Sequence, residues 1–147
     1  MAAKKKKLAK PLKPLSKSAL KKLIAKLDRK ATKVFNKYIR EYWRTLRDTC
    51  PLCEKNPISC CFHVVSAMRK KTRYDERNVI GACTPCNKYE NYFSDLSRAW
   101  YLRTFGLDTY LAVVDKASEP FEFTRDYLEN IIAHYSLKLE ELMKPKL

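Results

Sequence analysis

Apolar residues return every three or four positions through the first third of the chain, from Leu20 to Leu46. That period is typical of an amphipathic α-helix, and Ser16 or Ser18 stands where an N-cap is needed. The stripe consists of Leu20, Leu23, Ile24, Leu27, Ala31, Val34, Phe35, Tyr38, Ile39, Tyr42, Trp43 and Leu46. At 1.5 Å per residue, roughly 28 residues would make a helix about 42 Å long. We therefore expect one long helix over residues 16–48, with its stripe against the chain's own core or a second copy.

Two more helical stripes follow in the second half of the chain. The first comes after the last cysteine and carries Tyr89, Tyr92, Phe93, Leu96, Trp100 and Tyr101. Gly106 should end that helix, and a short helix should run from Leu107 to about Lys116. Beyond a linker at 118–123, Thr124 should cap the last helix. Its apolar residues are Tyr127, Leu128, Ile131, Ile132, Tyr135, Leu139 and Leu142.

The stretch between Cys50 and Asn87 shows no helical stripe. Val64 and Val65, directly after His63, are typical of a strand, so we expect a β-hairpin with the cation-rich segment 69–77 (RKKTRYDER) at its tip. Only two of the 147 residues are glycine, which favours helices joined by short connections. The predicted fold class is α+β, mostly helical. A long N-terminal helix precedes a small core with following helices over 49–117, and a C-terminal helix lies within 118–147.

Positive charge is concentrated in the first third of the chain. Of the 31 Lys and Arg residues, 17 lie between Met1 and Arg47, together with only two of the 16 acidic residues. The remaining chain holds 14 residues of each sign and has no net charge. Residues 1–15 (MAAKKKKLAKPLKPL) are too polar to bury a core and should form a disordered basic arm. This asymmetry indicates a polyanionic partner, either nucleic acid or an anionic membrane surface.

The basic faces of the long helix and the hairpin tip form the predicted DNA-binding surface, because cations without interspersed acids suit a phosphate backbone. The predicted contacts are Lys26, Lys30, Lys33, Lys37, Arg40, Arg44, Arg69, Lys70, Lys71 and Arg73. No apolar run approaches the ~18 residues of a membrane span, and no apolar segment follows the opening lysines as in a secretory signal. We expect a cytoplasmic protein whose six cysteines are reduced or metal-bound.

Four of the cysteines form two Cys-x-x-Cys knuckles. The knuckles are Cys50–Cys53 and Cys83–Cys86. Two such pairs supply four thiolates, enough to close a tetrahedral zinc site. The alternatives are a redox pair or four inert buried thiols, and the pattern is specific for metal rather than for function. Cys60 and Cys61 are expected to be buried apolar thiols.

Candidate catalytic residues lie between and just after the knuckles. We expect the hairpin to aim His63 toward the helix that opens after the second knuckle, where a neutral imidazole can take a proton from water attacking a phosphodiester. Asn87, in the first turn of that helix, offers a carbonyl oxygen to a hard divalent cation, and Glu90 and Asn91 extend the candidate ligand set. Asn78 should tie loop backbone together. Mg²⁺ or Mn²⁺ would stabilise the leaving 3′ oxygen.

This arrangement resembles the treble-clef HNH, or ββα-metal, nucleases, which carry a histidine on a hairpin, a middle asparagine, and a Cys-x-x-Cys followed by Asn or His. It is more closely similar to the phage recombination endonucleases called NinG or Rap. The similar segments are Phe35–Arg40 (FNKYIR), Cys50–Cys53, His63–Ser66 (HVVS), Thr72–Val79 (TRYDERNV) and Cys83–Asn87 (CTPCN). The resemblance covers roughly residues 30–115, and TRYDERNV is its most distinctive part.

The resemblance implies a treble-clef, ββα-metal core and specific roles for three residues. These are a general base at His63, a structural amide at Asn78 and a metal ligand at Asn87. It also implies cutting of branched DNA, such as Holliday junctions or strand-invasion intermediates, during phage recombination in an infected bacterial cell. Because junctions are commonly cut in two strands, we expect a homodimer joined through the long N-terminal helix.

Phe62 departs from many HNH enzymes, which place an acidic or histidine metal ligand directly before the catalytic histidine. The second metal ligand is therefore open among Asp75, Glu76, Glu90 and Asn91. The sequence predicts a metal-dependent endodeoxyribonuclease with structural Zn²⁺ and catalytic Mg²⁺ or Mn²⁺. Two alternatives remain: an HNH enzyme that nicks plain duplex DNA for packaging or mobility, and a zinc DNA-binding module without catalysis.

Overall fold

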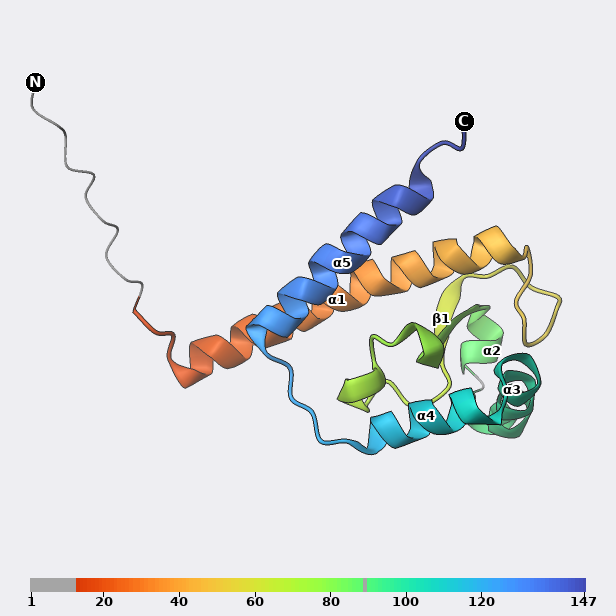
Figure 1. The fold of residues 1–147 in the computed structure, drawn as a ribbon, viewed down its shortest axis with the longest axis horizontal. Coiled ribbons are helices and arrows are strands. Elements are labelled where there is room, and N and C mark those ends of the chain that lie inside the picture. The colour runs from red at the N-terminus through yellow and green to blue at the C-terminus, as the bar shows by residue number, and fades with distance from the viewer. Residues whose placement is uncertain (1–12, 89) are drawn as a thin grey trace, which may run out of the picture.

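The computed structural model describes residues 13–88 and 90–147, apart from the side chains of 90–94. Most of the expected basic arm therefore lies outside the described residues. The elements in chain order are α1 (Lys17–Leu46), β1 (Cys60–His63), η1 (Lys70–Thr72), η2 (Glu76–Asn78), β2 (Val79–Ala82), α2 (Thr84–Lys88), α3 (Glu90–Phe105), α4 (Leu107–Ser118) and α5 (Arg125–Met143) (Figure 1). The expected mostly helical α+β class is confirmed. Among the described helices, none has the length and apolar content needed to cross a bilayer.

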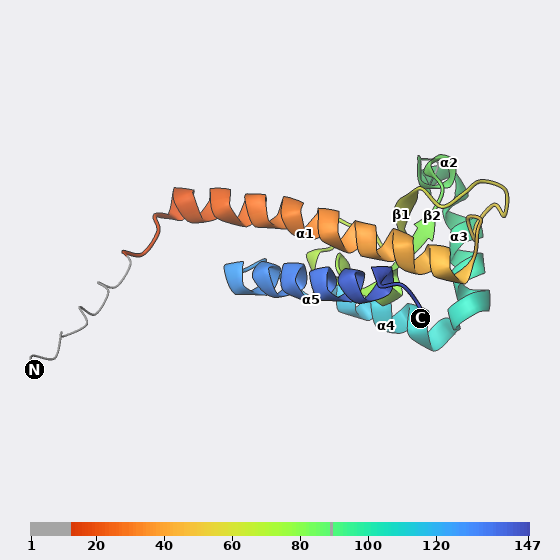
Figure 2. The same cartoon turned by 90° about the horizontal axis from the view of Figure 1, so that it is seen from above.

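Helix α1 forms where the apolar period predicts it, and its N-cap is Ser16, whose Oγ accepts a hydrogen bond from the Ala19 amide at 3.2 Å. Its stripe packs on α5, which lies alongside it and runs in the same direction, while the first turns of α1 extend past the start of α5 (Figures 1 and 2). At the centre of this pair, the fully buried Phe35 meets Tyr135 edge to face with 4.8 Å between ring centroids. The apolar stripe thus has a partner within the chain.

The two strands form an antiparallel hairpin in which Cys60 pairs with Ala82 and His63 with Val79. Side chains alternate between its faces. Val79 packs in the same core cluster as Phe35, toward α1, whereas Phe62 packs with the knuckle cysteines. The expectation of a strand led by His63 is wrong, because His63 ends β1. Strand pairing stops after His63, because the backbone of Val65, two residues further on, hydrogen-bonds the Asn78 side chain and not a neighbouring strand.

The hairpin lies very close to α1 at Gly81. A Cβ at this position would lie 2.6 Å from Trp43 Cβ and 2.9 Å from Ile58 Cγ2. The Trp43 atom is fixed to its backbone and cannot rotate away. Glycine is therefore required here for the close approach of β2 to α1.

We predict that Gly81→Ala destabilises the fold by about 1–3 kcal/mol, the usual cost of inserting a methyl group into a packed core. Chemical denaturation of the two proteins measures this difference. Gly106→Ala is a useful comparison, because Gly106 has φ of +86° but open space around its would-be Cβ, so only backbone strain opposes it. Equal stability of Gly81→Ala and the wild-type protein would contradict the close packing.

The segment expected to be a hairpin tip instead folds into the short 3₁₀ helices η1 and η2, which pack on α4. Tyr101 from α3 donates a hydrogen bond to the Arg77 carbonyl at 2.6 Å, and Lys116 from α4 pairs with Asp75 at 2.8 Å. Helix α3 ends at Phe105, directly before Gly106 as predicted. Thr124 caps α5, its Oγ1 accepting from the Tyr127 amide at 3.1 Å.

Candidate metal centre and histidine cleft

The four knuckle cysteines come together beside the hairpin. Their Sγ atoms all lie within 4.8 Å of one another, and those of Cys53 and Cys83 are 3.7 Å apart. A zinc ion with Zn–S bonds of about 2.3 Å would separate tetrahedral sulfurs by about 3.8 Å, so the cluster fits zinc. The Cys86 amide and the Asn56 side chain both donate to Cys83 Sγ, at 3.5 and 3.7 Å. These four residues could therefore hold a structural zinc that fixes the ends of the hairpin.

The other two cysteines are not part of this cluster. Cys61 is half-buried and its thiol donates to the Asn36 carbonyl at 3.2 Å, and burial raises its pKa to about 12. Burial also raises the pKa of Cys60, whose thiol donates to the Ala82 carbonyl at 3.5 Å. Both are protonated at neutral pH, as expected of structural thiols.

His63 lines a cleft of about 230 Å³ between α1 and the loop that follows β1. The cleft is lined by Thr32, Asn36, His63, Ala67, Met68, Arg73 and Tyr74. His63 Nε2 lies 3.1 Å from the Arg73 carbonyl oxygen, which can only accept, so the imidazole carries its proton on Nε2. Burial lowers the pKa of His63 below its ordinary 6.5. At neutral pH the ring is uncharged, with its lone pair on Nδ1, and no described residue hydrogen-bonds that atom.

The loop that supplies this carbonyl is held by Asn78. The buried Asn78 side chain accepts from the Val65 amide at 2.7 Å and donates to the carbonyls of Val65 and Thr72, at 2.9 and 3.1 Å. Three bonds to two separated backbone segments close the loop at its base. This is the tying role expected of Asn78, and it fixes where the His63 partner lies.

Arg73 is half-buried and its guanidinium is held by partners within the protein. Its guanidinium donates to Asp28 on α1 and to the Ala67 carbonyl, both at 2.7 Å. Tyr74 also donates to Asp28, at 2.5 Å. The predicted contact of Arg73 with DNA stays a prediction, and in this structure Arg73 pairs with Asp28, the single acidic residue in the first half of α1. Arg73 instead joins the loop to α1.

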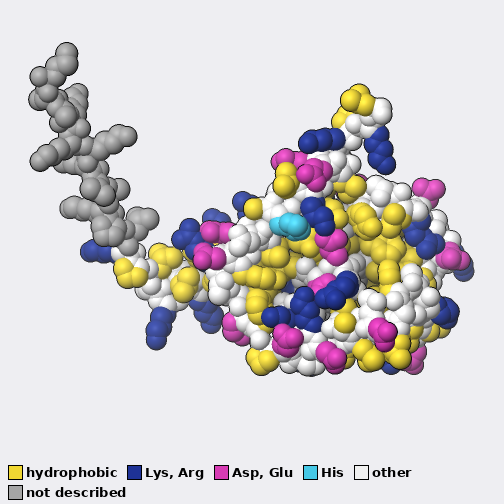
Figure 3. Space-filling view, viewed as in Figure 1, with side chains coloured by type: hydrophobic (Ala, Val, Ile, Leu, Met, Phe, Trp, Pro, Cys, Tyr) yellow, Lys and Arg dark blue, Asp and Glu magenta, His cyan; other side chains and the backbone are white. Residues whose placement is uncertain are grey.

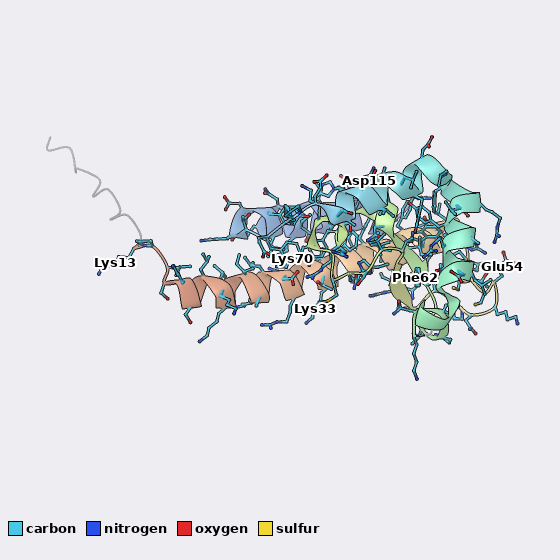
Figure 4. All side chains as sticks on the ribbon, turned by 90° about the horizontal axis from the view of Figure 1, so that it is seen from below. Lys13, Lys33, Glu54, Phe62, Lys70 and Asp115 are labelled. Carbon is cyan, nitrogen blue, oxygen red and sulfur yellow. The ribbon has the colours of Figure 1, made fainter. Side chains whose placement is uncertain are left out.

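The expected direction of His63 is also wrong. Phe62, labelled in Figure 4, packs with Cys83, Cys86 and Trp100 on the side of the hairpin that faces α2. Its neighbour His63 takes the opposite face and meets α1. Since Asn87 belongs to α2, the described structure does not bring His63 and Asn87 into one cleft. The physical reason is the alternation of side chains along β1, which puts Phe62 on the side of the knuckles and its neighbour His63 on the side of α1.

Two candidate ligands for a catalytic metal are already paired. Arg77 and Lys116 overcome the effect of burial and lower the pKa of Asp75 to about 2, while Glu76 pairs with Lys138. The side chains of the candidate ligands Glu90 and Asn91 lie outside the described residues. Within the described part of the chain, the four cysteines are the one group of His, Cys, Asp or Glu residues arranged to hold an ion. A second metal site therefore has no protein ligands assigned to it.

Basic residues of α1 lie next to the residues that line the histidine cleft. We call Lys26, Arg29, Lys30, Lys33, Lys37 and Arg40 together the basic row. On a helix surface, residues three or four apart are neighbours. Lys33 precedes Asn36 by three positions, Arg40 follows it by four, and Arg29 precedes Thr32 by three. The predicted contacts Lys26, Lys30, Lys33 and Lys37 are exposed, and Figure 3 shows Lys and Arg side chains along the start of α1.

The remaining predicted DNA contacts have partners of their own. Arg44 donates to the Ile58 carbonyl and pairs with Glu41, and in the loop Lys70 pairs with Glu122 and Lys71 with Glu119. Lys70 is labelled in Figure 4 together with Lys33 of α1. Exposed ion pairs of this kind contribute little stability, so a phosphate can replace the carboxylate. Arg69 is exposed.

A protein-family model described as the bacteriophage lambda NinG protein matches residues 1–145. The chain belongs to this family. Membership is consistent with a role in phage recombination. No curated protein and no solved structure matches the chain.

The polar wall of the cleft in this NinG-family chain was not predicted. Asp28, Thr32 and Asn36 follow one another at intervals of four along α1, between the apolar stripe and the basic row. Side chains at this spacing form one line along a helix. A polar line beside an apolar stripe indicates a boundary where another segment docks, and here that segment is the loop that carries Arg73.

Proposed function

We propose that this protein is a metal-dependent endonuclease that cleaves branched DNA during phage recombination, with His63 as its general base. The observation that carries the proposal is the position of the uncharged His63 at the edge of the basic row on α1. A general base must be neutral at working pH and within reach of the phosphodiester. Family membership and the zinc-sized cysteine cluster support the same function.

In this proposal, lysines of the basic row hold the phosphate backbone across the cleft mouth. Water that attacks the phosphorus transfers a proton to His63 Nδ1, the nitrogen that carries the lone pair. The imidazolium that forms is stabilised by its Nε2–H, which already donates to the Arg73 carbonyl. Asn78 keeps that carbonyl in place through the bonds described above. Hydrolysis would leave a 5′ phosphate and a 3′ hydroxyl.

The two metals have separate roles in the proposal. Zinc on the four cysteines would hold the knuckles, hairpin and α2 together as a treble-clef, ββα-metal core. Mg²⁺ or Mn²⁺ would stabilise the leaving 3′ oxygen, which a histidine cannot do. The described side chains near His63 do not form a carboxylate cage for such an ion, so we assign it no protein ligands.

Shape, and not base sequence, is the proposed basis of substrate choice. The basic row suits phosphate contacts, which position a protein on DNA without reading bases. A four-way junction and a linear duplex built from the same arm sequences, compared at equal concentration in Mg²⁺, test this directly. Faster cleavage of the junction supports the proposal, while equal rates favour the enzyme that nicks plain duplex. Cutting of two strands would still require a homodimer, whose interface stays a prediction.

A second candidate, a zinc DNA-binding module without catalysis, is favoured by the side chain of Phe62. It occupies the face of the hairpin toward α2, where an HNH enzyme would place its histidine opposite the metal ligand. Such a module would bind the junction and leave it intact in Mg²⁺ and in Mn²⁺. The two candidates therefore differ in cleavage and not in affinity.

Salt dependence tests the basic surface. Each phosphate contact contributes about −0.9 to the slope of log affinity against log salt on B-DNA. We predict that Lys33→Ala with Lys37→Ala flattens this slope by up to about 2, and that deletion of residues 1–15 flattens it further. Fluorescence anisotropy over a salt series measures the slopes. The control, Lys144→Ala with Lys146→Ala at the exposed C-terminal end, should leave the slope unchanged. Slopes equal to that of the wild-type protein would place DNA elsewhere.

A further inference from the structure

Met68 is unusually exposed for a large apolar side chain. Its relative exposure is 82%, and the next values within the chain are 66% for Leu96 and 59% for Met143; among the described residues only the terminal Leu147 exceeds it. Single exposed apolar residues are common on protein surfaces. Met68 differs because it lines the same cleft as His63 and precedes three consecutive cations, Arg69 to Lys71.

Hydrogen bonds hold the backbone at Met68 and at the residues before and after it. The Met68 amide donates to Ser66 Oγ at 3.2 Å, and the Arg69 amide to the Ser66 carbonyl at 2.9 Å. Arg73 donates to the Ala67 carbonyl at 2.7 Å and anchors the loop to α1 through Asp28. The loop therefore presents an apolar side chain to solvent at a defined place, which is the requirement for insertion into a partner without a large ordering cost.

We propose that Met68 is a wedge that inserts against an unstacked base at the branch point of the DNA substrate. This inference rests on the proposed function and specifies how that site would choose branched DNA. Apolar side chains, methionine included, insert between base steps where neighbouring cations hold the backbone. A thioether is polarisable and contacts aromatic rings favourably. A branch point offers bases that are already partly unstacked, whereas a linear duplex would first have to be opened.

The cations around Met68 are placed to hold the flanking phosphates. Arg69 is exposed, and Lys70 and Lys71 lie on η1 with carboxylate partners at the surface, Glu122 and Glu119. With the basic row of α1 on the other side of the cleft, a wedge at Met68 would place the branch next to His63. Selection and cleavage would then occur at one place.

The test uses a four-way junction with 2-aminopurine at the branch point, bound without added Mg²⁺ or Mn²⁺ so that cleavage is not needed and the structural zinc is kept. Wild-type protein should raise the 2-aminopurine fluorescence, and Met68→Ala should lose most of that rise. Met68→Ala should also weaken junction binding about 10-fold, in line with the loss of one base-stacking contact, and leave duplex binding unchanged. Met68→Leu should keep both signals. Met143→Ala, which removes an exposed methionine at the end of α5, should behave as wild type.

Equal fluorescence and equal junction affinity for wild type and Met68→Ala would overturn the wedge. Loss of affinity for junction and duplex alike would also overturn it, because that pattern belongs to a general contact. These readouts separate the wedge from the proposed nuclease activity. If the wild-type protein does not cut the junction, but the fluorescence rise that it causes is lost in Met68→Ala, the wedge is supported and the nuclease is not. If wild type and Met68→Ala cut the junction equally well and neither changes the fluorescence, the nuclease is supported and the wedge is not.

Discussion

Replacing His63 with alanine is expected to leave junction binding unchanged and to lower the single-turnover cleavage rate roughly 10²-fold or more, the usual contribution of a positioned general base. Binding should survive because the ring is turned into the cleft and the phosphate contacts belong to α1 and η1. His134→Ala is the matched control, since His134 is exposed on α5 and its loss should not alter the rate. A His63→Ala protein that cuts at the wild-type rate would remove His63 from the reaction.

The cleavage rate should also depend on pH, falling when His63 becomes protonated at low pH. The base works only when neutral, and burial lowers the pKa of His63 below 6.5. The wild-type rate should therefore stay on its plateau as pH falls to the ordinary histidine value, and decline only at lower pH as the ring becomes protonated. The residual rate of His63→Ala should lack this decline. A wild-type decline centred above pH 6.5 would contradict the buried, neutral imidazole.

Replacing Cys83 with serine is expected to abolish zinc binding and unfold the region around the knuckles. Cys83 is 1% exposed and packs with Phe62 and Ile80, so the metal and the small core around it depend on each other. Structural zinc binding contributes about 10–16 kcal/mol in zinc-finger peptides, as much as the whole stability of many domains. The wild-type protein should contain about one zinc per chain. The variant should contain none and melt at a lower temperature.

Cys60→Ser provides the control for this substitution. Cys60 is half-buried in β1, next to the cluster but not part of it, and should leave the zinc content unchanged. Zinc content by atomic absorption and thermal unfolding by circular dichroism measure both effects. Full zinc occupancy in Cys83→Ser would show that the four sulfurs do not form the site.

Features with a regular sequence signal could be predicted from the chain alone. The apolar period placed α1 and narrowed its cap to Ser16 or Ser18, of which Ser16 is the cap; Thr124 marked the start of α5, and Gly106 the end of α3. Each depends on interactions within a few residues. The two Cys-x-x-Cys knuckles likewise supply four cysteines at a spacing typical of a zinc site, so a four-cysteine cluster could be expected from the sequence.

The direction of His63 could not be predicted, because it depends on the register of the hairpin. Successive residues of a strand face opposite sides, so a shift of one position exchanges Phe62 and His63 between α2 and α1. The sequence contains no turn that fixes this register; the loop between the strands is instead closed by Asn78. The partner of Arg73 could not be predicted for a related reason. A cation's partner is decided by tertiary contacts, here with Asp28, 45 positions away along the chain.

The measurement that tests the central claim most directly is incision of a labelled four-way junction by wild-type protein in Mg²⁺. We predict that the junction is cut and that the products carry 5′ phosphate and 3′ hydroxyl ends, as ligation of the products would show. A junction that is fully bound yet intact in both Mg²⁺ and Mn²⁺ would contradict the proposal and identify the protein as a zinc-dependent DNA-binding module.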